Sequence, residues 1–132
     1  MSLRTTPVTF DVSRIPGPFV ISGAGGFVGA HLLDALSQGR NDVIGFGPRA
    51  EPWRIGAAGP SLRYEVVDDE HLRGFLERHQ PKTIINMAAA GAYSFQTDSH
   101  RIPHVNIALV EELATWAATN GAVLIHAGSS SE

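Results

Sequence analysis

A glycine-rich loop near the start of the chain constrains its fold more than any other feature of the sequence. The loop reads Gly23-Ala24-Gly25-Gly26-Phe27-Val28-Gly29 and follows the apolar run Phe19-Val20-Ile21. Apolar residues then recur at helical spacing, at Val28, Leu32, Ala35 and Leu36. Glycines between a strand and a helix let the helix present its free amides and the positive end of its dipole to an anion. This context separates the loop from an ordinary flexible turn, in which a glycine triplet alone is a weak signal.

The spacing G-x-x-G-x-x-G gives each glycine a separate task. Gly23 permits a tight turn, Gly26 lets the backbone approach a phosphate, and Gly29 lets the helix pack closely on the strand, while Gly25 adds flexibility. Such a loop is typical of sites for the pyrophosphate of a dinucleotide. The residues predicted to line that site are Gly23, Gly25, Gly26, Phe27, Val28 and Gly29.

From Phe19 onward, short apolar runs alternate with amphipathic stretches, as in βαβ units. The predicted strands are Phe19-Val20-Ile21, Val43-Ile44-Gly45-Phe46, the alternating residues 62–66, Ile84-Ile85-Asn86-Met87 and Val123-Leu124-Ile125. Right-handed crossovers fold this order into an α/β Rossmann fold, a three-layer α/β/α arrangement whose parallel sheet has the expected strand order 3-2-1-4-5. Residues 1–17 have no sustained period and are predicted to form an extended N-terminal arm before a dinucleotide-binding domain over residues 18–132.

Composition narrows the class of ligand. The chain has 132 residues, 43% of them hydrophobic, which suits one domain with one core. Its 10 basic residues are spread along the chain and the net charge is -3, so nothing indicates a nucleic-acid surface. Without cysteine or a long apolar run, we expect a cytoplasmic protein that has no membrane segment. His100 and His104 have the spacing of a metal pair, but Pro103 disrupts the helix that would align them, so no metal site is predicted.

The end of the second predicted strand bears on the choice of cofactor. Folds that bind NAD place an Asp or Glu there to bond the ribose 2′-hydroxyl, whereas folds that bind NADP use a small residue with a nearby arginine. Here the sequence is Phe46-Gly47-Pro48-Arg49, without an acid. The guanidinium of Arg49, alone or with Arg54, can pair with a 2′-phosphate in a bidentate geometry. NADP is therefore slightly favoured over NAD, with an ordinary solvated loop arginine as the second interpretation.

Two later motifs add to the glycine loop. Thr83-Ile84-Ile85-Asn86-Met87-Ala88-Ala89-Ala90 is similar to V-I-H-L-A-A at the end of a strand, and Gly128-Ser129-Ser130-Ser131-Glu132 is similar to S-S-x-E-V-Y-G. With these motifs, residues 18–132 resemble the N-terminal part of the extended short-chain dehydrogenase/reductase family, of the NAD-dependent epimerase/dehydratase type that acts on nucleotide sugars. Asn86 stands where that family more often has His.

The resemblance implies roles for residues around the cofactor. In such proteins the backbone at the positions of Ala88 and Ala89 lies against the cofactor ribose. An Asn in the following helix, matched here by Asn106, braces the site; a plain polar residue at a helix start is the alternative. An Asp after the third strand holds the adenine amine, and Asp68 is the nearest match, with its register left open.

The resemblance also implies the chemistry. Ser130 matches a catalytic Ser/Thr whose hydroxyl bonds the sugar oxygen that is oxidised, with an ordinary loop serine as the alternative. Glu132 matches a glutamate that can help to remove a proton beside a new carbonyl. The family's general base is the Tyr of Tyr-x-x-x-Lys, whose pKa a nearby ammonium lowers. That motif does not occur in these 132 residues, in which Lys82 is the only lysine, and the family carries it beyond the Ser/Thr.

We therefore expect the NAD(P)-binding N-terminal portion of a longer nucleotide-sugar epimerase or dehydratase that works by transient hydride transfer. By itself this portion should lack catalysis. The alternatives are a catalytically inactive dinucleotide-binding regulatory module and a ketone reductase of the same family. Because the fifth strand would be an unpaired sheet edge, we also expect a homo-oligomer.

Overall fold

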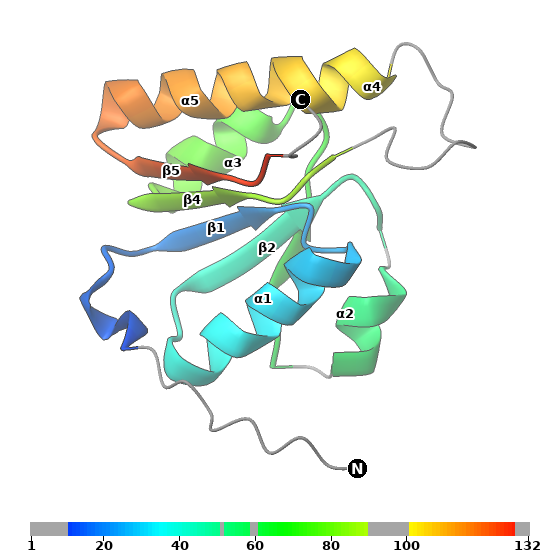
Figure 1. Ribbon diagram of the computed structural model, residues 1–132, viewed down its shortest axis with the longest axis vertical. Coiled ribbons are helices and arrows are strands. Elements are labelled where there is room, and N and C mark those ends of the chain that lie inside the picture. Colours follow the sequence, from blue (N-terminus) through cyan, green and yellow to red (C-terminus); the bar gives the residue numbers. More distant parts are fainter. Residues whose placement is uncertain (1–10, 51, 59–60, 90–100, 129–132) are drawn as a thin grey trace.

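The computed structural model describes residues 11–50, 52–58, 61–89 and 101–128. Within them, one sheet of five parallel strands has the order β3-β2-β1-β4-β5 (Figure 1). The strands are β1 (Phe19–Ser22), β2 (Val43–Gly47), β3 (Tyr64–Val66), β4 (Thr83–Asn86) and β5 (Val123–His126). The predicted order 3-2-1-4-5 is confirmed. Strand order reverses between β1 and β4, and open α/β sheets bind their ligands outside the carboxyl ends of the strands at such a point.

Helices cover both faces of the sheet, which confirms the predicted three-layer Rossmann fold (Figure 1). One face carries α1 (Phe27–Gly39) and α2 (Trp53–Ala58), and the other carries α3 (Leu72–His79) and α5 (Leu109–Asn120). A short α4 (Arg101–Pro103) and a π-helical turn, η2 (His104–Ala108), lead into α5, and a 3-10 turn, η1 (Val12–Arg14), precedes β1.

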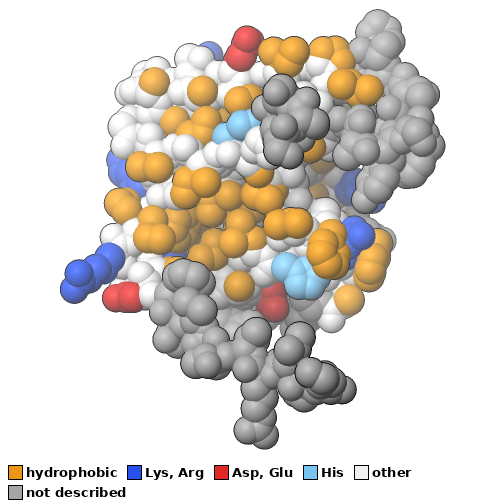
Figure 2. Space-filling model, viewed as in Figure 1, with side chains coloured by type: hydrophobic (Ala, Val, Ile, Leu, Met, Phe, Trp, Pro, Cys, Tyr) orange, Lys and Arg blue, Asp and Glu red, His pale blue; other side chains and the backbone are white. Residues whose placement is uncertain are grey.

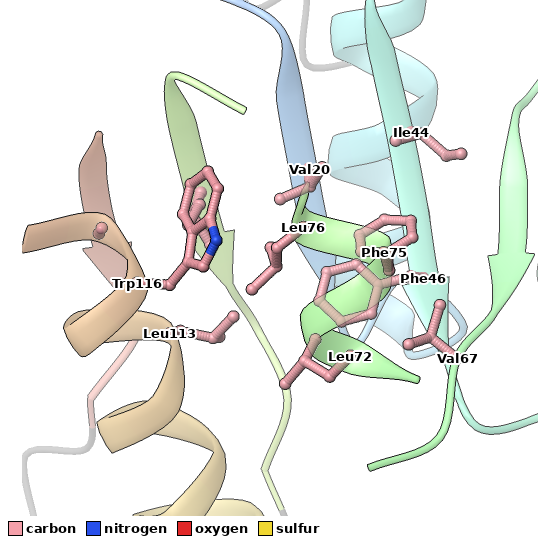
Figure 3. Close-up of a cluster of buried hydrophobic side chains, with 11 residues drawn as sticks. Val20, Ile44, Phe46, Val67, Leu72, Phe75, Leu76, Leu113 and Trp116 are labelled. Atoms are coloured by element: carbon pink, nitrogen blue, oxygen red, sulfur yellow. The ribbon is translucent and has the colours of Figure 1, made fainter. Parts of the chain in front are cut away.

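The core on the α3 and α5 face is built from large side chains (Figure 3). Phe46 of β2 and Phe75 of α3 stack at a centroid distance of 4.6 Å. Leu76 of α3 and Leu113 of α5 are fully buried, and Trp116 of α5 packs in the same core. Each such side chain contributes about 1.5–3 kcal/mol by leaving water, so this core holds both helices firmly on the sheet.

The rotation of α1 differs from the prediction. Its buried residues are Gly29, Ala30 and Leu33, whereas Val28 is 55% exposed and Ala35 is exposed as well. The predicted apolar stripe is therefore wrong at these two positions. The spacing of apolar residues locates a helix, but it carries no information on backbone contacts at the end of that helix. Here the close approach of Gly29 to the preceding loop determines which side of α1 faces the sheet.

Residues 11–17 are held at the amino end of the sheet by Arg40. Its guanidinium donates to the carbonyls of Val12 (2.6 Å) and Ile15 (2.7 Å), forms a two-bond pair with Asp42 and stacks on Phe19 at 4.4 Å. The pair lowers the pKa of the Asp42 carboxyl and raises that of Arg40. Residues 1–10 of the predicted arm lie outside the described residues.

Candidate functional site

The glycine loop joins β1 to α1 at the carboxyl end of the sheet. Gly23 has a left-handed φ of 68°, and its carbonyl accepts a hydrogen bond from the Gly26 amide at 3.0 Å. Gly26 is the N-cap of α1, and its carbonyl accepts the first helical bond, from Ala30 at 3.0 Å. The predicted tight turn at Gly23 is thus present.

Two of the glycines are required by close backbone contacts. A Cβ on Gly29 would lie 2.1 Å from the carbonyl oxygen of Gly23, so only glycine lets α1 pack this closely on the loop. A Cβ on Gly23 would lie 2.6 Å from the nitrogen of Ala88, at the end of β4. The loop therefore lies directly against the chain that leaves β4, and the predicted contact residues of both segments share one edge.

The N-terminus of α1 is open. Gly26 makes no side-chain capping bond, and Phe27 and Val28 are 66% and 55% exposed. The first amides of an α-helix have no acceptor within the helix, and together with the helix dipole they favour an anion. This end of α1 can therefore receive a diphosphate through the backbone of Gly26, Phe27, Val28 and Gly29.

The segment after β2 places a cation on the loop. Buried Pro52 lies against Gly25, and Nη1 of Arg54 donates to the Gly25 carbonyl at 3.3 Å while its guanidinium stacks on Trp53 at 4.6 Å. Arg49 is exposed, and its carbonyl accepts a hydrogen bond from the Tyr64 hydroxyl at 3.1 Å. Burial raises the pKa of the Tyr64 phenol, with a smaller opposing effect from the charge of Arg49. Of the two arginines considered for a 2′-phosphate, Arg54 is the one in contact with the glycine loop.

Asp68 follows β3, and its carboxylate holds the start of α3. Its Oδ1 accepts hydrogen bonds from the backbone amide (3.0 Å) and from Nδ1 (2.5 Å) of His71. The bond with the His71 side chain is the main cause of a lowered pKa at Asp68, and the same bond raises the pKa of His71. Both side chains remain largely exposed, so the carboxylate is open to a ligand on its other side.

A row of polar side chains crosses the carboxyl ends of β1, β4 and β5. Ser22 lies beside Asn86, and Asn86 lies beside His126, in the register of the parallel ladders. The Ser22 hydroxyl donates to Asn86 Oδ1, and Asn86 Nδ2 lies 3.1 Å from His126 Nδ1. Sequence reasoning did not single out Ser22 or His126. The available signal was a polar residue at the end of an otherwise apolar strand.

The remaining predicted site residues either lie away from the row of Ser22, Asn86 and His126 or fall outside the residues that the structure describes. Ala89 is exposed just after β4, and Asn106 is exposed on η2. Ser130 and Glu132 lie outside the described residues. Within the described ranges, no three His, Cys, Asp or Glu side chains gather as a metal site would require. No helix in the same ranges has the length and apolar character needed to cross a bilayer.

The fold and the loop agree with a comparison against protein families. The model of the NAD dependent epimerase/dehydratase family matches residues 19–132. The chain belongs to this family. The resemblance inferred from the glycine loop, the end of β4 and the serine-rich stretch is thereby confirmed. The comparison with curated proteins finds no match.

Several solved structures share the fold of this chain. A UDP-glucose 4-epimerase from Stenotrophomonas maltophila, with bound NAD and formylated UDP-arabinopyranose, is 18% identical with a TM-score of 0.69, over 86% of this chain and 37% of that one. An L-threonine dehydrogenase from Cupriavidus necator, in its holo form, is 24% identical with a TM-score of 0.62, over 78% and 34%. A UDP-glucose 4-epimerase from Thermotoga maritima is 19% identical with a TM-score of 0.67, over 82% and 36%. The alignments therefore span about a third of the length of these proteins.

Proposed function

We propose that this chain is the NAD(P)-binding portion of a nucleotide-sugar epimerase or dehydratase. The observation that carries the proposal is the glycine loop, in which a Cβ on Gly23 or Gly29 would collide with backbone atoms, together with the exposed helix end beside it. When bound there, a nicotinamide dinucleotide supplies reversible acceptance of a hydride. The chain's own residues bind and orient it.

Each part of the proposed site has a task. The amides at the start of α1 bind the pyrophosphate, and the backbone of Ala88 and Ala89 contacts the ribose on the opposite side of the loop. Asp68 is proposed to hold the adenine amine with the carboxylate oxygen that His71 leaves available. Asn106, on η2, is proposed to brace the site.

The substrate side of the proposal depends on Ser130 and Glu132. Ser130 would hydrogen-bond the sugar hydroxyl that is oxidised, and Glu132 would help to remove a proton beside the new carbonyl. A sugar nucleotide is the proposed substrate, and the cytoplasm the proposed location. Family membership supports this assignment, as do the UDP-sugar epimerases among the structures of the same fold.

Arg54 supports a preference for NADP. It reaches the glycine loop from α2, where the adenosine half of a dinucleotide would lie, and β2 ends without the acid that would select NAD. Arg49 lies on the loop between β2 and α2 and can add a second hydrogen bond to a 2′-phosphate.

Calorimetric titration with NAD and NADP tests the binding proposal. We expect both dinucleotides to bind, NADP more tightly. Arg54→Ala should weaken NADP binding by roughly tenfold, since a hydrogen bond to a charged group contributes about 1.5–3 kcal/mol, and should change NAD binding much less. Arg73→Ala, at an 81% exposed side chain on α3, is the matched control and should change neither. Tighter binding of NAD, or equal losses for both dinucleotides in Arg54→Ala, would overturn the NADP preference.

A simple dehydrogenase or ketone reductase is the second candidate, because L-threonine dehydrogenases share the fold. The two activities differ in what happens to the cofactor. An epimerase or dehydratase leaves the dinucleotide in its starting oxidation state. A dehydrogenase accumulates the reduced form and a reductase the oxidised form, so absorbance at the reduced nicotinamide band separates these activities from an epimerase or dehydratase. Binding of dinucleotide by the full-length protein without turnover of any sugar nucleotide or ketone would favour the regulatory module.

A further inference from the structure

The hydrogen bonds around Asn86 determine which way its amide points. The side chain is fully buried and has three polar neighbours: the Ser22 hydroxyl, the backbone amide of Ala88, and His126 Nδ1. A backbone N–H can only donate, so the atom that faces Ala88, at 3.3 Å, must be the carbonyl oxygen Oδ1. The amide nitrogen then faces His126 at 3.1 Å. The alternative flip would place two donors against each other at Ala88.

This orientation determines the state of the His126 ring. Because Asn86 Nδ2 is a donor, Nδ1 of His126 must accept, and an imidazole accepts at Nδ1 only when its proton is on Nε2 and the ring is neutral. A protonated ring would present an N–H to the amide N–H of Asn86. The bond would be lost, and with it one of the three contacts that hold the amide.

Asn86 in turn holds the wall of the proposed cofactor site. Its Oδ1 bonds the amide of Ala88, whose nitrogen would lie 2.6 Å from a Cβ on Gly23. The preceding amide, of Met87, donates to the Ser22 carbonyl at 3.1 Å. Movement of the Asn86 side chain therefore reaches the backbone that contacts the glycine loop.

Other charged groups near β5 belong to separate contacts. The adjacent strand β4 contains no titratable residue. On α5, which packs on β5, Glu111 and Glu112 are exposed and line a groove shared with α3. On η2, His104 pairs with Asp69 at 2.7 Å. Among the described residues, none of these forms an ion pair with His126.

We propose that His126 is a positioning residue for the dinucleotide site: its neutral ring holds Asn86, and through it the Ala88 backbone, and protonation of the ring releases that hold and weakens dinucleotide binding. The inference rests on the proposed cofactor function. It assigns to the last residue of β5 a pH-dependent control of affinity.

The test compares NAD affinity at pH 8 and pH 5.5 in the wild-type protein and in three variants. NAD is the probe because the 2′-phosphate of NADP itself titrates, with a pKa of about 6. The His126→Asn side chain can offer an oxygen near the position of Nδ1 but does not titrate, and the His126→Lys side chain has only donors. His79→Asn, at a histidine of α3 that contacts Glu65 of β3, is the matched control.

The wild type and His79→Asn should lose roughly two- to tenfold in affinity at the lower pH, the equivalent of one hydrogen bond of about 0.5–1.5 kcal/mol. His126→Asn should bind as the wild type does at pH 8 and keep that affinity at pH 5.5, while His126→Lys should bind weakly at both. A His126→Asn protein that retains the wild-type pH dependence overturns the proposal, as does a wild type whose affinity is equal at both pH values.

NMR of the imidazole nitrogens provides a readout that needs no cofactor. At pH 8, Nδ1 of His126 should be unprotonated and Nε2 protonated; the opposite tautomer would overturn the proposal even if NAD binds. Failure of the wild type to bind either dinucleotide at pH 8 would instead defeat the proposed function, and the positioning role with it. The two failures are thus distinguishable.

Discussion

Replacement of Gly29 by alanine is the sharpest test of the proposed cofactor site. The added Cβ would lie 2.1 Å from the Gly23 oxygen, 2.8 Å from the Gly23 carbon and 3.0 Å from the Ala24 Cα, all of them backbone atoms. No side-chain rotation can relieve these contacts. The Gly23 oxygen is also held in place, because it accepts the Gly26 amide at 3.0 Å.

Either α1 must move outward or the turn must open. Overpacking of this kind costs about 1–3 kcal/mol, and the melting temperature should fall by roughly 3 to 12 °C in a domain of this size. Displacement of the helix end also moves the amides that we propose to bind the pyrophosphate. Dinucleotide affinity should therefore fall by roughly tenfold or more, because hydrogen bonds to a charged group contribute about 1.5–3 kcal/mol.

Gly74→Ala is the matched control, since Gly74 lies within α3 and a Cβ there meets nothing within 4 Å. It should raise stability by up to about 1 kcal/mol through helix propensity and leave dinucleotide affinity unchanged. Differential scanning calorimetry and calorimetric titration measure the two effects. If Gly29→Ala melts and binds as the wild type does, the close packing of α1 on the loop is refuted.

Three further outcomes test other parts of the molecule. Asp42→Asn should lower the free energy of unfolding at neutral pH. Because Arg40 lowers the pKa of the Asp42 carboxyl below its usual 3.8, this loss of stability should disappear as the pH falls through that lowered pKa. A loss that stays unchanged down to pH 2 in urea unfolding contradicts this prediction. Leu113→Ala, at a fully buried position, should cost about 2–5 kcal/mol by calorimetry, and a cost under about 1 kcal/mol would exclude it from the core. Hydrophobic side chains gather over the middle of the face that Figure 2 shows. On β5, at the edge of the sheet, Val123 and Ile125 are 52% and 50% exposed. Ile125→Lys should abolish a self-association that light scattering detects in the wild type, and a monomeric wild type refutes the predicted oligomer.

Prediction succeeded for the backbone geometry of the glycine loop. The tasks of Gly23 and Gly29 follow from the absence of a side chain, which the sequence displays directly, and the structure adds only which atoms they approach. Prediction from the sequence fell short where side chains from distant segments meet. Arg54 was a secondary candidate beside Arg49, yet it is the arginine that reaches the loop, because the buried Pro52 lies against Gly25 and α2 begins directly after it.

The amino-acid sequence by itself determined the alternation of strands and helices, the strand order and the place of the glycine loop, because hydrophobic period, crossover handedness and glycine are local properties of the chain. Only the tertiary structure decided the rotation of α1 and the row Ser22, Asn86 and His126. Those three residues are 64 and 40 positions apart along the chain and become neighbours only through the register of parallel strands. A hydrogen bond between them depends on distances that no local pattern encodes. The turn and close packing of the glycine loop could be predicted from the sequence, and the polar row beside it could not.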